Sequence, residues 1–226
     1  MKKYVQEATD INIWTSIKNN TFERNKDIKE FIDGLELIDE SACISLDAKW
    51  GDGKTFFVRQ IEEVLKYVLA NQRADEENPI EKIPSYEYLK DNEMMAKIDL
   101  KHSYLPIYYN AWMYDNHSDP LMSLLLVMTK TCKGVYDTKI DSEKISEKLI
   151  KALSTLPISL GEFKMNPFTV AEKLQVKKVD ILSLVQTEEE IRERVKGIFN
   201  DIIVERAQKL IIFIDELDRC RPSFAI

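Results

Sequence analysis

The first half of the chain alternates between helical and strand-like spacing of its apolar residues. Residues 21–33 carry apolar side chains on one helical stripe, and Gly34 follows at the position of a left-handed C-cap. Residues 42–46, ACISL, form a short apolar run that predicts a buried strand. Residues 56–70 return to helical spacing, so the predicted order is helix, strand, glycine-rich segment and helix.

The rest of the chain contains two further predicted strands separated by a long helical region. Residues 71–79 are polar and acidic and end the preceding helix. Residues 104–112, YLPIYYNAW, predict an aromatic strand in which Pro106 favours a sheet edge. Residues 120–209 are mostly helical, and we interpret them as packing helices with a solvated outer face, or alternatively as a lid or partner surface. Residues 210–214 are apolar and lead directly into two carboxylates.

Composition excludes several classes of protein. At 226 residues, with 44% hydrophobic and 31% charged residues, the chain suits one globular domain rather than a disordered one. Its formal net charge of -7 opposes general nucleic-acid binding. Three well-separated cysteines with no CxxC pair argue against a zinc site or disulfide framework and favour a reducing cytoplasm. No apolar run approaches the roughly 20 residues of a membrane span.

The glycine-rich segment closely matches a phosphate-binding loop. Residues 45–57, SLDAKWGDGKTFF, fit the pattern G-x-x-x-x-G-K-[ST], except that Ala48 replaces the first glycine. Gly51 and Gly53 lie where the backbone must approach a phosphate most closely. Alanine at position 48 adds one methyl group and is tolerable where the local φ stays negative. An incidental glycine turn between strand and helix is the alternative.

Four side chains supply the chemistry of a Mg·ATP site. The Lys54 ammonium can bind the β and γ phosphates, and the Thr55 hydroxyl can ligate Mg²⁺. At the end of the last predicted strand, Asp215 would hold the metal and Glu216 would polarise the attacking water. A strand that ends in a solvated acidic turn is the alternative. The predicted nucleotide-binding residues are Trp50, Gly51, Asp52, Gly53, Lys54, Thr55 and Phe56.

Charged residues after the acidic pair have less specific roles. We favour an ion pair of Asp218 with Arg219 or Arg221 over a role as a third acidic group near the metal. Either arginine could stabilise charge as a finger in an oligomer, although a surface ion pair is the more common role.

Three segments in order resemble the KAP family of P-loop NTPases. They are DAKWGDGKTFF at 47–57, YYNAW at 108–112 and IIFIDELDRC at 211–220. The resemblance implies an α/β fold of the additional-strand P-loop type, with a three-layer parallel sheet, and ATP hydrolysis coupled to a conformational switch. Family members are associated with phage exclusion in bacteria and with membrane-linked signalling in animals. Many contain inserted transmembrane helices, which this sequence lacks.

The resemblance also suggests roles for two residue types near the strand ends. Asn110 resembles a polar switch residue that holds the catalytic glutamate out of line, and a strand-end asparagine bonded to its own backbone is the alternative. Trp50 and Trp112 could frame the nucleotide, but core packing is the more common role of such aromatics. Glu216 departs from the aspartate that the family often has, and it suits a water-polarising base.

The implied domain is a single P-loop unit over residues 1–226, with a mostly helical insertion at 113–209. In the implied sheet a further strand with sensor residues lies between the loop strand and the acidic strand, and it would follow Ile226. We therefore expect an incomplete sheet with exposed edges. The chain is then the N-terminal part of a longer polypeptide, or it needs a second chain to complete the sheet.

Three functions are consistent with these residues. The first is an ATPase switch that uses ATP and Mg²⁺. The second is a non-hydrolysing nucleotide-binding scaffold that binds a protein partner, or itself, through the helical insertion. A small-molecule phosphotransferase comes third, because such kinases commonly lack an acidic pair after a buried strand.

Overall fold

The computed structural model describes residues 7–49, 51–75, 79–116 and 207–222, with isolated positions at 120, 123–124, 127–128, 131 and 197. The chain divides into two compact units. One consists of Met1–Tyr109 and Ala207–Asp215, and the other of Asn110–Arg206 and Glu216–Ile226. No helix in the described part of the chain combines the length and apolar character needed to cross a membrane.

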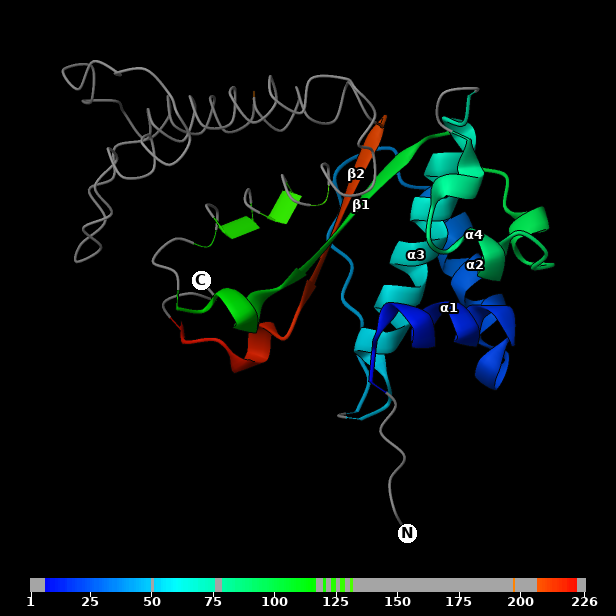
Figure 1. The fold of residues 1–226 in the computed structure, drawn as a ribbon. Helices are drawn as coiled ribbons and strands as arrows, with labels where there is room; N and C mark the ends of the chain where they lie inside the picture. The colour runs from blue at the N-terminus through cyan, green and yellow to red at the C-terminus, as the bar shows by residue number, and fades with distance from the viewer. Residues whose placement is uncertain are drawn as a thin grey trace, which may run out of the picture. The chain divides into compact units, whose positions relative to one another are not determined.

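Four α-helices form the helical layer of the first unit (Figure 1). They are α1 (Asp10–Lys18), α2 (Arg24–Leu35), α3 (Lys54–Gln72) and α4 (Tyr86–Leu89). The structure confirms the helices that were predicted over residues 21–33 and 56–70. Gly34 lies inside α2, which ends at Leu35 with Glu36 as a right-handed C-cap, so the predicted left-handed C-cap at Gly34 is wrong.

Helix α1 was not predicted, although its sequence contains the signals. Thr9 is the N-cap and its side-chain oxygen accepts a hydrogen bond from the Asn12 backbone nitrogen. Asp10 lies in the first turn and Lys18 in the last, as the helix dipole favours. Helix α1 packs against α3 and α4, and α2 also packs against α3.

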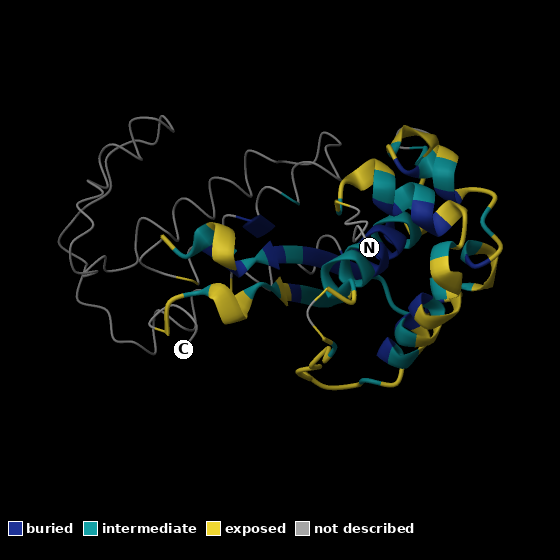
Figure 2. Cartoon of the chain, turned by 90° about the horizontal axis from the view of Figure 1, so that it is seen from below, coloured by how far each residue is buried: buried dark blue, intermediate teal, exposed yellow. Residues whose placement is uncertain are grey.

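A cluster of buried apolar side chains holds these helices together, and Figure 2 colours the buried positions of the chain dark blue. Fully burying one such side chain contributes about 1.5–3 kcal/mol. The members that are at most 1% exposed are Ile13, Ile17, Ile28, Ile32, Ile61, Val64, Leu65 and Leu89.

Two parallel strands lie side by side in the first unit (Figure 1). Both predicted strands exist: β1 covers Tyr104–Asn110, shorter than the predicted 104–112 because a 3₁₀ turn begins at Ala111, and β2 covers Lys209–Asp215. The register is fixed where they begin, because the backbone nitrogens of Gln208 and Lys209 both donate to the Ser103 carbonyl at 3.0 Å. Since parallel strands that start together also end together, the carboxyl ends of β1 and β2 lie at the same edge.

The predicted buried strand at residues 42–46 is wrong. Residues 41–49 form neither helix nor strand, and Ile44 and Leu46 are 54% and 41% exposed. A strand is stable only when a neighbour supplies the other half of its hydrogen bonds, and in the described sheet β1 and β2 pair with each other. The predicted helices between residues 120 and 209 fall almost entirely outside the described residues.

Candidate functional site

Two glycines shape the loop between residue 47 and helix α3. Gly51 and Gly53 have φ values of 89° and 84°, in the left-handed region that other residues adopt only with strain. Asp52 closes the turn between them. Its backbone nitrogen donates to the Lys49 carbonyl at 3.2 Å, and its Oδ2 accepts from the Lys49 nitrogen at 3.0 Å.

Alanine at position 48 fits the loop without strain. Ala48 is not among the described non-glycine residues with positive φ, which confirms the condition under which alanine is tolerable there. Its carbonyl accepts a hydrogen bond of 2.6 Å from Lys54 Nζ, which also lies 3.4 Å from the Lys49 carbonyl. The Lys54 ammonium therefore binds carbonyl groups of its own loop, the same loop that would bind a phosphate.

Helix α3 begins with the backbone geometry of an anion site. Its N-cap is Gly53, no side chain caps it, and its first turn contains no acidic residue. The first N–H groups of a helix have no intrahelical partner, and the helix dipole makes this end positive. Lys54 and Thr55 occupy this first turn, so an ammonium and a hydroxyl flank the exposed amides.

Arg24 braces the outside of the loop, and sequence reasoning did not find it. Its Nη2 donates to the Asp52 carbonyl at 2.9 Å and its Nη1 to the Gly53 carbonyl at 3.4 Å. The guanidinium also lies 6.0 Å from the centre of the Phe57 ring. Arg24 begins α2 within a charged segment, where nothing in the local pattern distinguishes it from a solvated residue.

Asp215 ends β2 beside the neighbouring strand. The Tyr108 hydroxyl of β1 donates a hydrogen bond of 2.8 Å to Asp215 Oδ2. Thr55 and Asp215 both belong to the first unit, and a hydroxyl and a carboxylate are hard oxygen donors of the type that Mg²⁺ takes. No group of three or more acidic, histidine or cysteine side chains that could hold a metal occurs among the described residues. This donor set fits Mg²⁺, which is usually held by one or two protein groups together with substrate phosphates.

Glu216 belongs to the second unit and has a strained backbone with φ of 59°. Its Oε2 forms an ion pair with Arg219 Nε, and the Arg219 guanidinium lies 5.4 Å from the centre of the Trp112 ring. Trp112 is 54% exposed, so the expectation that it packs in the core is wrong. Because the Arg219 guanidinium lies over the Trp112 ring, this exposed ring makes a cation–π contact.

The expected ion pair of Asp218 is also wrong. Arg221 Nε lies 3.2 Å from Asp115 Oδ2, and the Arg221 backbone nitrogen donates to Asp115 Oδ1 at 2.9 Å. Arg219 pairs with Glu216 instead. Asp218 forms none of the ion pairs among the described residues, because Arg219 and Arg221 each pair with another acidic residue.

Asn110 caps the short 3₁₀ turn that follows β1. Its Oδ1 accepts a hydrogen bond of 3.1 Å from the Met113 backbone nitrogen. This local backbone bond is the alternative to a switch role, and the switch role stays a prediction. Trp50 lies outside the described residues.

Comparison with known families decides what kind of domain this geometry belongs to. The model of the KAP family P-loop domain matches residues 24–226. The chain belongs to the KAP family of P-loop NTPases. No curated protein and no solved structure matches it significantly. Membership identifies this KAP chain as a nucleotide-binding NTPase domain.

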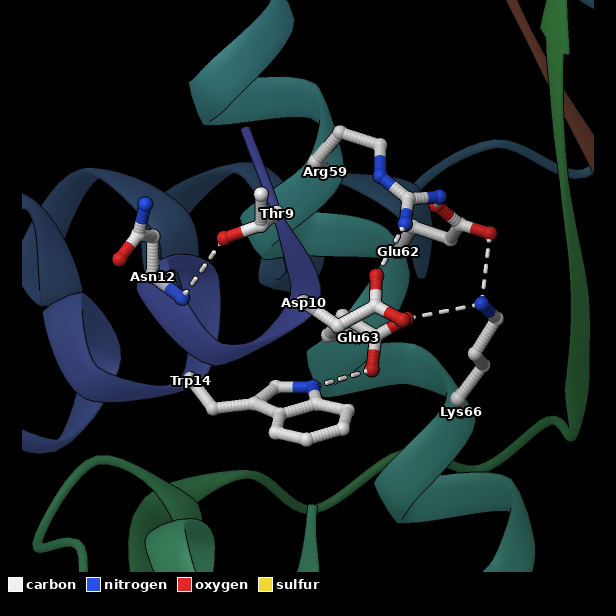
Figure 3. A network of polar contacts seen from close by, with 8 residues as sticks. All are labelled: Thr9, Asp10, Asn12, Trp14, Arg59, Glu62, Glu63 and Lys66. Carbon is white, nitrogen blue, oxygen red and sulfur yellow. Dashed lines mark hydrogen bonds and ion pairs between the residues drawn. The ribbon is translucent and has the colours of Figure 1, made fainter. Parts of the chain in front are cut away.

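A buried charge network lies on helix α3 of the KAP domain (Figure 3). Lys66 Nζ lies 2.8 Å from a carboxylate oxygen of Glu62 and 2.8 Å from one of Glu63. Arg59 pairs with Glu62 and, at 2.8 Å, with Asp10 of α1. Charged residues on a helix usually indicate a solvated face, so sequence reasoning missed that Glu62 and Glu63 are buried.

Burial determines the proton affinities within this network. Desolvation raises the pKa of Glu62 even though Lys66 and Arg59 oppose the shift. Desolvation disfavours the charged form of Lys66, but the charges of Glu62 and Glu63 outweigh it and raise the pKa of that ammonium. The network therefore keeps its cations charged at neutral pH.

Proposed function

We propose that this KAP domain binds Mg·ATP and hydrolyses it to drive a conformational switch, in an anti-phage or membrane-associated complex of the kind that the family resemblance implies. The observation that carries the proposal is the loop before α3, in which two left-handed glycines lead into an uncapped helix N-terminus beginning with Lys54. A Mg²⁺ ion bound there would neutralise charge on the phosphates. Lys54 would exchange its bonds to the Ala48 and Lys49 carbonyls for bonds to phosphate oxygens.

The remaining roles follow from the donor groups. The Thr55 hydroxyl and the Asp215 carboxylate would hold the metal, and the loop amides of Gly51 to Phe56 would bind the phosphates. Glu216 would accept a proton from the attacking water, with Asn110 controlling its position. Because Glu216 is paired with Arg219, it must first leave this partner, and that release is the simplest form of a switch.

Two substitutions separate binding from hydrolysis. Lys54→Ala should lower nucleotide affinity at least about tenfold, because a charge-assisted bond contributes about 1.5–3 kcal/mol. Glu216→Gln should retain binding and lose phosphate release. Lys49→Ala is the matched control for Lys54, since the loop uses only the Lys49 backbone. Unchanged affinity in Lys54→Ala would contradict the proposal, and unchanged turnover in Glu216→Gln would remove that residue from its role.

A non-hydrolysing scaffold is the second candidate, and the ion pair between Glu216 and Arg219 favours it. In a pure scaffold, wild type and Arg219→Ala would both bind nucleotide without releasing phosphate. If the pair instead restrains an active base, Arg219→Ala should release phosphate faster than wild type. A coupled phosphate-release assay on both proteins distinguishes these outcomes.

A further inference from the structure

We propose that Tyr108 positions the Asp215 carboxylate for the metal ion, and that Arg59 connects this carboxylate to helix α3. The inference rests on the proposed function, because it takes Asp215 as a Mg²⁺ ligand. It goes further in naming two residues that touch neither nucleotide nor metal but determine how the metal is held.

The contact between Tyr108 and Asp215 fixes the orientation of the carboxylate. The Tyr108 hydroxyl lies 2.8 Å from Oδ2, and the two residues come from adjacent parallel strands of the same unit. A carboxylate that accepts a hydrogen bond at a defined oxygen loses rotational freedom. Partners of this kind commonly change metal affinity by about 10–100-fold when they are removed.

Arg59 packs against the ring of Tyr108. Its guanidinium lies 4.9 Å from the centre of the Tyr108 ring, within the range of a cation–π contact. The Arg59 side chain is only 17% exposed and is itself fixed by Glu62 on α3 and Asp10 on α1. Figure 3 shows Arg59 reaching between these carboxylates. The ring of Tyr108 thus packs on a cation that cannot easily move away.

The same helix carries the other metal-binding group. Thr55 and Arg59 are four residues apart in α3, so they lie on one face of the helix. A continuous path therefore runs from Thr55 along one helical turn to Arg59, across the ring of Tyr108 and through its hydroxyl to Asp215.

Tyr108→Phe tests the hydroxyl alone, because it keeps the ring over Arg59. Mn²⁺ replaces Mg²⁺ as the probe, and its affinity for the full chain saturated with ATP is measured by electron paramagnetic resonance. Nucleotide affinity is measured separately in EDTA. We expect Mn²⁺ affinity to fall about tenfold or more, and affinity in EDTA to stay within about twofold, because no metal takes part there. Equal losses in both measurements, or none in the first, would overturn the inference.

Two controls separate this inference from the proposed function. Asp215→Asn should weaken Mn²⁺ binding whenever Asp215 is a ligand, so an unchanged value would mean that the proposed metal site has failed. A loss in Asp215→Asn without one in Tyr108→Phe would remove only the positioning role. Tyr88→Phe is the matched tyrosine control, because its ring packs on Trp14 in the helical layer and Mn²⁺ affinity should not change.

The role of Arg59 is tested by a double-mutant cycle. Arg59→Lys keeps the charge but loses the planar group over the ring, and should weaken Mn²⁺ binding in the wild-type background. The effect should be absent in the Tyr108→Phe background, because Arg59 acts through the hydroxyl. If the losses of Mn²⁺ affinity in the two single variants add up in the double variant, the role of Arg59 is overturned. If Arg59→Lys does not fold, Asp10→Asn removes one of the partners that fix Arg59 and completes the same cycle.

Discussion

At Gly53 the backbone conformation disfavours a side chain, and an added β-carbon would also crowd Arg24. Its φ is 84°, and an added β-carbon would lie 3.3 Å from Arg24 Nη1. Gly34 offers the matched comparison, since it lies within α2 and an added β-carbon there would meet nothing within 4 Å. The backbone conformation of Gly53 therefore favours glycine, whereas nothing around Gly34 excludes a side chain.

We expect Gly53→Ala to destabilise the protein by about 1–2 kcal/mol, the cost of a left-handed non-glycine residue. Gly34→Ala should stabilise it by about 0.5–1 kcal/mol, because alanine loses less entropy in a helix. Urea unfolding followed by circular dichroism measures both. The backbone argument fails if the two substitutions change the free energy of unfolding in the same direction.

Glu36 gives stability a defined pH dependence. Desolvation acts to raise its pKa, but hydrogen bonds from Tyr104, His102 and Lys101 outweigh it and lower the pKa below the ordinary 4.5. The backbone nitrogens of Lys101 and His102 donate to it at 3.2 and 3.4 Å. A carboxyl with a lowered folded pKa stabilises the fold above its unfolded value, and this contribution disappears as the pH falls through the folded pKa.

We expect Glu36→Gln to melt below wild type at about pH 6–7, with the gap closing as the pH falls below about 4. Thermal unfolding across this range measures the effect. Glu40→Gln, on an exposed side chain of the following loop, should melt as wild type at every pH. A constant gap between wild type and Glu36→Gln would show that the hydrogen bonds do not depend on the charge of residue 36.

At the scale of elements, α3 combines an apolar side with buried charges. Lys66 is the clearest example, since its side chain is 18% exposed and it pairs with two carboxylates. Lys26 and Glu30 on α2 form an ion pair whose side chains are 79% and 65% exposed. Removing one partner of a buried pair leaves an uncompensated charge, whereas exposed pairs contribute little.

We expect Lys66→Met to cost about 3 kcal/mol at pH 7, and Lys26→Met to cost less than about 1 kcal/mol. The loss in Lys66→Met should be smaller at a mildly acidic pH than at pH 7, because a raised pKa lets the buried Glu62 take up a proton more readily. Urea unfolding at both pH values measures this. A pH-independent loss would show that packing, not charge, makes Lys66 important.

The periodicity of apolar residues predicted some of the described helices and strands correctly, but not every segment. It predicted α2, α3, β1 and β2 because their apolar residues face one core in a regular repeat. It failed at residues 42–46, where an equally apolar segment is exposed. A helix forms its backbone hydrogen bonds internally. A strand needs a neighbouring strand to form them, and its own sequence does not contain that neighbour.

At the scale of the whole molecule, a bound nucleotide stabilises the folded state against unfolding. A ligand that binds only the folded state at 100 times its dissociation constant stabilises it by about 2.7 kcal/mol. For a chain of 226 residues this corresponds to an increase in Tm of about 5–10 °C.

We expect Mg·ATP to raise the Tm of wild type and Glu216→Gln equally, and to raise the Tm of Lys54→Ala by at most about half as much. Differential scanning fluorimetry with and without EDTA measures the shift. Lys49→Ala serves as the control and should retain the full increase. A shift that disappears in Glu216→Gln would show that this residue contributes to binding rather than to chemistry.

The sequence by itself determined the family, helices α2 and α3, strands β1 and β2, and the chemical groups of the proposed site, because these depend on local spacing and residue type. Only the tertiary structure revealed that Arg24 braces the loop, that Tyr108 contacts Asp215 and that Arg59 contacts Tyr108. Tyr108 and Asp215 are 107 positions apart. Contacts of this kind arise when separate elements pack, and no periodic pattern within one segment encodes them.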